Sequence, residues 1–159
     1  MKDLLPLAER IGALLKQRKE TIAIAESSSG GLIAAALLSV PGASAYFLGG
    51  VVVYTRKSMQ ELLGFSEESF KGMRGLTEQT ALVLARGARD RLSSTWGISE
   101  IGAAGPTGSR YGDAAGTTSI AVVGASERAA VIRTGNSDRA ANMRAFADGA
   151  LRLLEESLK

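Results

Sequence analysis

Three consecutive serines at positions 27–29 are the residues of this chain best placed to do chemistry. They follow a run of β-branched and small apolar residues at 21–25, which predicts a short buried strand. Two glycines and an apolar segment at 32–38, which predicts a helix, come directly after them. A strand that turns into a helix presents free backbone N–H groups and the positive end of the helix dipole, which suits a phosphate or a developing oxyanion. A simpler interpretation is that the serines only cap the helix.

The composition limits which groups can take part in such chemistry. The 159 residues include neither Cys nor His, which excludes thiolate nucleophiles, imidazole bases and ordinary zinc sites. Any acid–base step must therefore use Lys, Asp, Glu, Tyr or a group of the substrate. The net charge of +3 hints at anionic ligands, but no basic run or aromatic-studded patch supports a nucleic-acid partner.

The length and a hydrophobic content of 45% fit one domain, residues 1–159, around a single core. Charges interrupt the apolar residues of the N-terminal segment MKDLLPLAERIGALLKQRKE, so we expect neither a signal peptide nor a membrane span. We therefore expect a soluble, cytoplasmic protein with no membrane partner.

The order of the predicted elements indicates the fold. Apolar spacing and capping signals predict helices at 3–17, 30–39, 56–63, 77–92 and from 137 or 138 to at least 154. Strands are expected at 21–26, 50–54, 96–103, 117–123 and 129–133. Helical crossovers join the early strands and a hairpin joins the last two, which predicts an α/β/α sandwich with a mixed sheet and helices on both faces. The hairpin leaves a sheet edge that must be covered or paired, so we expect a homo-oligomer, either a dimer or a trimer.

A glycine-rich stretch at 102–116 is the second candidate functional segment. It holds five of the 19 glycines and one of the three prolines, and a loop of this length inside a compact domain is usually functional or disordered. Neither this stretch nor the serine turn matches a P-loop, a dinucleotide fingerprint or a G-x-S-x-G elbow. The residues alone therefore indicate an α/β domain with an anion site between the serine turn and the glycine-rich loop.

The motifs, taken in order, resemble the CinA C-terminal family, whose characterised members are nicotinamide mononucleotide deamidases. The matching segments cover nearly the whole chain and read AESSSGG, PGASAYFLGGVVVYT, LLG, and GAAGPTG with GT just beyond it. The resemblance implies an amidohydrolase that converts nicotinamide mononucleotide and water to nicotinate mononucleotide and ammonia, with a small-molecule mononucleotide substrate and with no metal or other cofactor.

The same resemblance assigns catalytic roles. It implies that Ser27 is the nucleophile and that Tyr54 is a catalytic partner. The family's base is a Lys five residues after that Tyr, where this chain has Met59, and a thioether cannot take a proton. Lys57 is the only lysine near the vacated position. If 56–63 is a regular helix, Lys57 lies about 200° around the axis from Met59 and faces away, but if the helix starts later its amine could swing toward the serine.

Substrate-binding residues are implied for both functional segments. They are Glu26, Ser28, Ser29, Gly30 and Gly31 at the serine turn, and Gly102, Ala104, Gly105, Pro106, Gly108 and Thr117 at the glycine-rich loop. Glu26 adjoins the nucleophile and could be a base or a hydrogen-bond anchor for the reaction, but a carboxylate at a strand end equally well anchors the turn itself. We expect N–H groups of residues 29–31 or 102–108 to hold the oxyanion.

Two functions remain open at this point. Retention of Ser27 and Tyr54 favours an amidohydrolase with a rearranged base. Loss of the family lysine at Met59 favours a catalytically silent paralogue that binds a mononucleotide. In either case we expect Ser27, rather than Ser28 or Ser29, to face the pocket.

Overall fold

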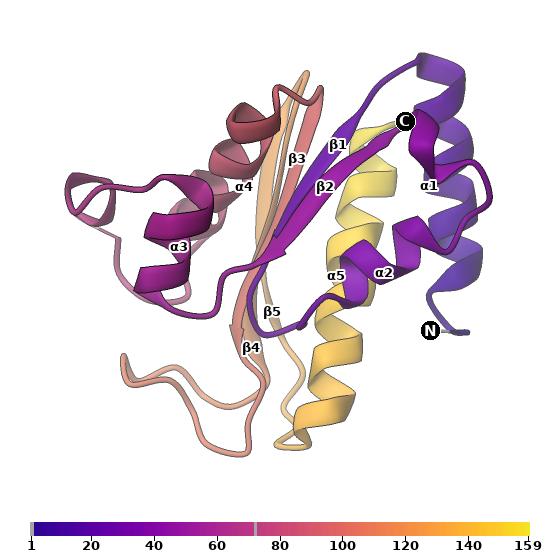
Figure 1. Ribbon diagram of the computed structural model, residues 1–159. Coiled ribbons are helices and arrows are strands. Elements are labelled where there is room, and N and C mark those ends of the chain that lie inside the picture. The colour runs from indigo at the N-terminus through magenta and orange to yellow at the C-terminus, as the bar shows by residue number, and fades with distance from the viewer. Residues whose placement is uncertain (1, 72) are drawn as a thin grey trace.

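The computed structural model describes residues 2–71 and 73–159 and confirms the predicted α/β sandwich (Figure 1). The helices of the described residues are α1 (Leu5–Arg18), α2 (Leu32–Leu38), α3 (Arg56–Leu63), α4 (Glu78–Leu92) and α5 (Arg139–Ser157). The strands are β1 (Ile22–Glu26), β2 (Phe47–Val52), β3 (Trp96–Ala103), β4 (Thr117–Val123) and β5 (Glu127–Arg133).

The five strands form one mixed sheet in the order β2-β1-β3-β4-β5. β1 pairs in parallel with both β2 and β3, whereas β4 pairs antiparallel with β3 and with β5. The carboxyl ends of three parallel strands therefore meet at one edge of the sheet, which is where α/β proteins place their ligands. In this chain that edge carries the serine turn after β1, the segment after β2 and the glycine-rich loop after β3.

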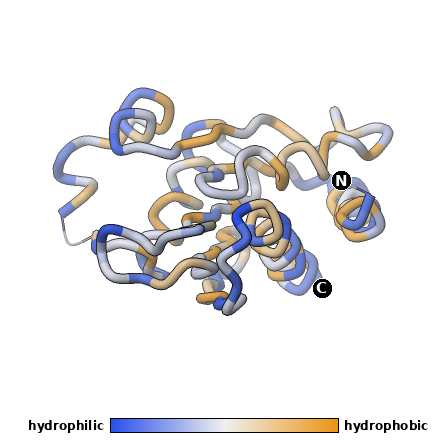
Figure 2. Tube along the Cα trace, turned by 90° about the horizontal axis from the view of Figure 1, so that it is seen from below, coloured by the Kyte–Doolittle hydropathy of each residue, from blue (hydrophilic) through white to orange (hydrophobic). Residues whose placement is uncertain are grey.

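The two faces of the sheet are packed differently because side chains alternate along each strand. On one face Ile22 and Ile24 of β1 join the core beneath α1, α2 and α5. On the other face the small Ala23 and Ala25 pack with residues of α3 and α4. Seen end on, the helices beside the labelled termini carry hydrophilic residues on their outer sides (Figure 2).

β2 is displaced from its predicted position at 50–54. The strand begins at Phe47, because Ile22 of β1 already pairs with Phe47. The N–H of Ile22 also donates to the carbonyl of Tyr46 at 2.8 Å. It ends at Val52, so Tyr54 lies beyond the strand and does not close it. β5 likewise starts at Glu127, two residues before the predicted start.

β2 and β5 are the two edge strands of the sheet. The expectation that the 117–133 hairpin ends the sheet is therefore confirmed, while self-association through such an edge stays a prediction. No helix of residues 2–71 and 73–159 combines the length and apolarity needed to cross a membrane.

The close approach of α4 to β3 generates the first prediction. Gly97 of β3 lies directly beneath α4, and a Cβ there would overlap the carbonyl oxygen of Ala85. We expect Gly97→Ala to lower the free energy of unfolding by about 1–3 kcal/mol, because the rigid helix backbone must move. Urea denaturation measures this change.

Gly49→Ala is the matched control, since its Cβ would meet only the end of the Leu92 side chain at 2.9 Å, and that side chain is 44% exposed. If both variants lowered the free energy of unfolding equally, contact with the helix backbone would not explain the effect at Gly97.

Candidate active site

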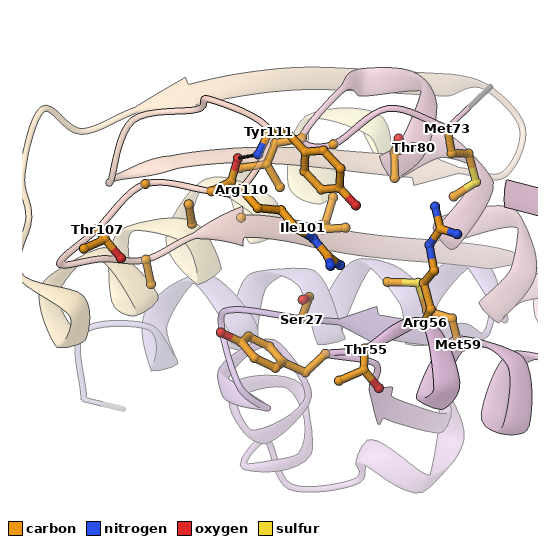
Figure 3. A pocket seen from close by; sticks show the side chains of 18 of the residues that line it. Ser27, Thr55, Arg56, Met59, Met73, Thr80, Ile101, Thr107, Arg110 and Tyr111 are labelled. Atoms are coloured by element: carbon orange, nitrogen blue, oxygen red, sulfur yellow. Dashed lines mark hydrogen bonds between the residues drawn. The ribbon is translucent and has the colours of Figure 1, made fainter. Parts of the chain in front are cut away.

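A cavity of about 370 Å³ opens at the carboxyl edge of the parallel strands (Figure 3). Its wall is built from the first residue after β1, the segment from Tyr54 to Met59, parts of the connection between α3 and α4, the end of β3 with the glycine-rich loop, and the start of α5. Five separate stretches of sequence thus converge on one site, and three of them follow parallel strands that end at the same edge of the sheet.

Ser27 is the only one of the three serines that lines the cavity among the described residues. Its side chain stands at the centre of the view in Figure 3, and its hydroxyl makes no hydrogen bond to a described residue. The predicted orientation of Ser27 is therefore confirmed. No described group that could take its proton forms a hydrogen bond with it, so its role as nucleophile stays a prediction.

Glu100 of β3 holds the serine turn from beneath. Its carboxylate is fully buried and accepts the backbone N–H groups of Ser27 and Ser29, at 3.2 and 2.8 Å. It also accepts the hydroxyl of Ser28, and that of Thr118 at 2.8 Å. Four donors thus satisfy a charge that would be very costly to bury alone.

Glu26 is a second buried carboxylate and caps α2 in place of the serines. It accepts the N–H groups of Gly31, Ile33 and Ala34 at 2.7–3.0 Å, together with the hydroxyl of Ser29 at 2.7 Å. Burial raises the pKa of Glu26, and the nearby Glu100 carboxylate acts in the same direction, against the lowering effect of the donors. The interpretation that the serines cap the helix is therefore wrong, and Glu26 anchors the turn.

This arrangement changes the expected oxyanion donors. The N–H groups of Ser29 and Gly31 are taken by the two carboxylates, and that of Gly30 by the carbonyl of Ser27 at 3.2 Å. Within the described residues, the Ser28 N–H has no such acceptor. Among the N–H groups of the turn in the described residues, that of Ser28 is therefore the one without a partner, and the Ser28 hydroxyl is taken by Glu100.

α3 brings Met59, and not a lysine, to the cavity. The helix is regular from Arg56 because Thr55 and Ser58 form a reciprocal capping box. Lys57 is consequently turned outward, 84% exposed and paired with Glu61 at 3.6 Å, so the structure does not bring it to Ser27. The thioether of Met59 and the guanidinium of Arg56 line the cavity instead (Figure 3).

The first turns of α5 fix the glycine-rich loop. The Asn142 amide donates to the carbonyl of Ala104 at 2.8 Å, and Arg139 donates to that of Gly105 at 2.8 Å. Arg139 also donates to the hydroxyl of Tyr54 at 3.3 Å. These bonds link α5, the loop and the segment after β2 around the cavity mouth.

The implied substrate-binding residues divide into two groups. Gly102, Ala104, Gly105 and Gly108 line the cavity, as does Tyr54 among the implied catalytic residues. Gly102 also permits close packing, since a Cβ there would lie 2.7 Å from the Ser28 hydroxyl. The residues outside the cavity wall are Glu26, Ser28, Ser29, Gly30, Gly31, Pro106 and Thr117.

Glu100 was not predicted as a site residue, and neither were the cavity arginines Arg56, Arg110 and Arg139. The sequence could have indicated Glu100, because a charged residue in the middle of an otherwise largely apolar strand must find buried partners. No pattern indicated the arginines, since surface arginines are common and only the fold shows which ones share a cavity. Among the described residues no cluster of His, Cys, Asp and Glu could hold a metal ion.

Comparisons with known proteins agree on one family. The family model of the CinA C-terminal domain matches residues 4–158. A CinA-like protein of Anaeromyxobacter sp. (strain K) is 39% identical over 99% of this chain, and one of Salinibacter ruber is 39% identical over 89%. The chain spans only 38% and 34% of these relatives.

Solved structures show the same relationship. The competence/damage inducible protein CihA of Agrobacterium tumefaciens superposes with a TM-score of 0.88 at 30% identity, covering 98% of this chain and 95% of that protein. A CinA superfamily protein of Klebsiella pneumoniae 700603 gives a TM-score of 0.90 at 25% identity, with coverage of 98% and 97%.

The buried carboxylate of Glu26 predicts a pH dependence of stability. Because its pKa is raised in the folded state, the folded chain binds a proton more tightly than the unfolded chain does. The ordinary pKa of a glutamate is 4.5. As the pH rises from this value through the raised pKa of Glu26, the free energy of unfolding should therefore fall, by at most about 1.4 kcal/mol per pH unit.

Urea denaturation across that range should show this slope in the parent and not in Glu26→Gln. Glu155→Gln is the control. Arg10 lowers the pKa of Glu155, so Glu155 affects the pH dependence of stability only below pH 4.5. A parent slope that persists unchanged in Glu26→Gln would refute the assignment to Glu26.

Proposed function

This chain belongs to the CinA C-terminal domain family, and on that basis we propose that it is an amidohydrolase acting on nicotinamide mononucleotide. The observation that carries the proposal is the unbonded hydroxyl of Ser27, which faces a cavity walled by cationic and apolar side chains. A phosphate suits the cations, and a pyridine ring suits the apolar part of the wall.

The proposed reaction proceeds in two steps. The Ser27 oxygen attacks the carboxamide carbon, the C–N bond breaks, and ammonia leaves with the proton that the serine loses. N–H groups of the glycine-rich loop, whose residues Gly102 to Gly105 line the cavity, would stabilise the negative oxygen of the intermediate. A water molecule then cleaves the ester, which releases nicotinate mononucleotide and restores the serine hydroxyl.

Tyr54 is the protein group best placed to move that proton. Its phenol oxygen accepts a hydrogen bond from Arg139, which leaves the phenolic hydrogen free to be donated to the leaving nitrogen. Tyr54 lies at the cavity mouth and is 58% exposed, so water can exchange protons with it.

A second function is favoured by Met59, which occupies the position of the family's lysine and lines the cavity. In this alternative the chain binds the mononucleotide and does no chemistry. The absence of any described base near the Ser27 hydroxyl supports it. The following two experiments separate the alternatives.

The first experiment measures ammonia release from nicotinamide mononucleotide by the purified chain. We expect slow release by the parent and none above background by Ser27→Ala, because the attacking oxygen is gone. Ser39→Ala is the matched control, since it removes an exposed hydroxyl at the far end of α2. Equal rates for the parent and Ser27→Ala would exclude the serine as nucleophile.

The second experiment restores the missing base. We expect Met59→Lys to raise turnover by about 10²–10⁴-fold, the usual contribution of a general base, because the new amine would enter the cavity beside Ser27. Leu62→Lys, on the exposed side of the same helix, adds the same charge outside the cavity and should change nothing. Ligand binding without turnover in the parent and in Met59→Lys would favour the silent paralogue.

A further inference from the structure

The cavity wall has an unbalanced charge. Arg56, Arg110 and Arg139 line it, and among its described residues there is no Asp or Glu. Neither Arg56 nor Arg110 forms an ion pair within residues 2–71 and 73–159. Their guanidinium carbons lie instead 5.1 Å from the ring centre of Phe70 and 5.2 Å from that of Tyr111. The cavity therefore has positive charge available for an anionic ligand.

Arg56 is not explained by the stability of its helix. It is the first residue of α3, where the helix dipole disfavours a cation. The adjacent Lys57 is paired with Glu61 on the outer side of the helix, whereas Arg56 is directed into the cavity beside Met59 and Met73 (Figure 3). Its stacking on Phe70 holds the side chain on that side.

Arg56 and Arg139 lie on opposite sides of the cavity. Arg56 is on one side, and Thr107 of the glycine-rich loop is on the opposite side, with Ser27 between them (Figure 3). Arg139 belongs to the second side, because it bonds the carbonyl of Gly105 in the same loop. Arg110 lies between the two sides in this view, and the uncharged side chains that line the rest of the space include Met59 and Ile101.

The chemistry of a guanidinium limits what Arg56 can do. It stays protonated at any physiological pH, so it cannot replace a lysine base. It can form two parallel hydrogen bonds to a carboxylate, whereas a neutral carboxamide offers one acceptor and brings N–H donors that a guanidinium repels. The α3 side of the cavity is thus suited to holding an anion.

We propose that the cavity takes a ligand with an anionic group at each end of a flat apolar body, and that Arg56 selects a carboxylate over a carboxamide. This inference rests on the proposed function and refines its ligand class. It means that nicotinate mononucleotide binds more tightly than nicotinamide mononucleotide, with the phosphate on the side of Arg139 and the carboxylate at Arg56. A chain that hydrolyses the amide would then hold its product and release it slowly.

Calorimetric titration with the two mononucleotides tests the proposal. Every protein carries Ser27→Ala, so that neither ligand is converted during the measurement. We expect the Ser27→Ala chain to bind nicotinate mononucleotide with a dissociation constant at least about tenfold lower than that for nicotinamide mononucleotide. One charge-assisted hydrogen-bonded pair accounts for a difference of this size. Adding Arg56→Met should bring the two dissociation constants to within about twofold, and Arg56→Lys should retain part of the preference, because it keeps the charge and loses the planar fork.

Lys57→Met is the matched control, since it removes the same charge one residue away on the outer side of α3. It should leave the preference intact. Equal affinities in the Ser27→Ala chain, or equal losses in Arg56→Met and Lys57→Met, would overturn the role of Arg56. If Ser27-dependent ammonia release is observed while the preference is absent, only this inference fails. If neither mononucleotide binds, the proposed function fails with it.

Discussion

Two buried carboxylates under one turn are the constraint on which the rest of this structure depends. Glu26 and Glu100 together accept eight hydrogen bonds, from the backbone and hydroxyls of the serine turn, from the start of α2 and from Thr118. Burying such carboxylates is very costly unless donors surround them, so the donors must stay where they are. The turn is therefore held rigidly, and Ser27 is the serine left over to face the cavity.

The cavity combines two firmly held segments of backbone with a helix that sets the charge of one side. The serine turn and the glycine-rich loop are fixed by buried polar contacts, which preorganises the backbone N–H groups near Ser27. α3 sets the charge of its side of the cavity, because its capping box fixes the register that brings Met59 and Arg56 inward and turns Lys57 outward. This side of the cavity thus carries a positive charge.

The elements were predictable from local pattern, and the site only in part. β3 and β4 have their predicted bounds, because both segments are rich in apolar and β-branched residues. β2 was misplaced because its start depends on pairing with β1, which no local pattern reports. Ser27 could be assigned from the motif of its turn, but the partners of Ser28 and Ser29 come from β1 and β3 and appear only when the sheet is assembled.

The bonds from Arg139 and Asn142 to the glycine-rich loop have a dynamic consequence. Both residues lie in the first turns of α5, and both are tied to carbonyls of the loop that walls the cavity. The loop cannot swing outward unless those turns unwind or break these bonds. Fraying of the helix end and opening of the cavity therefore form one cooperative unit of local unfolding, and amide hydrogens in the two segments should exchange with solvent together.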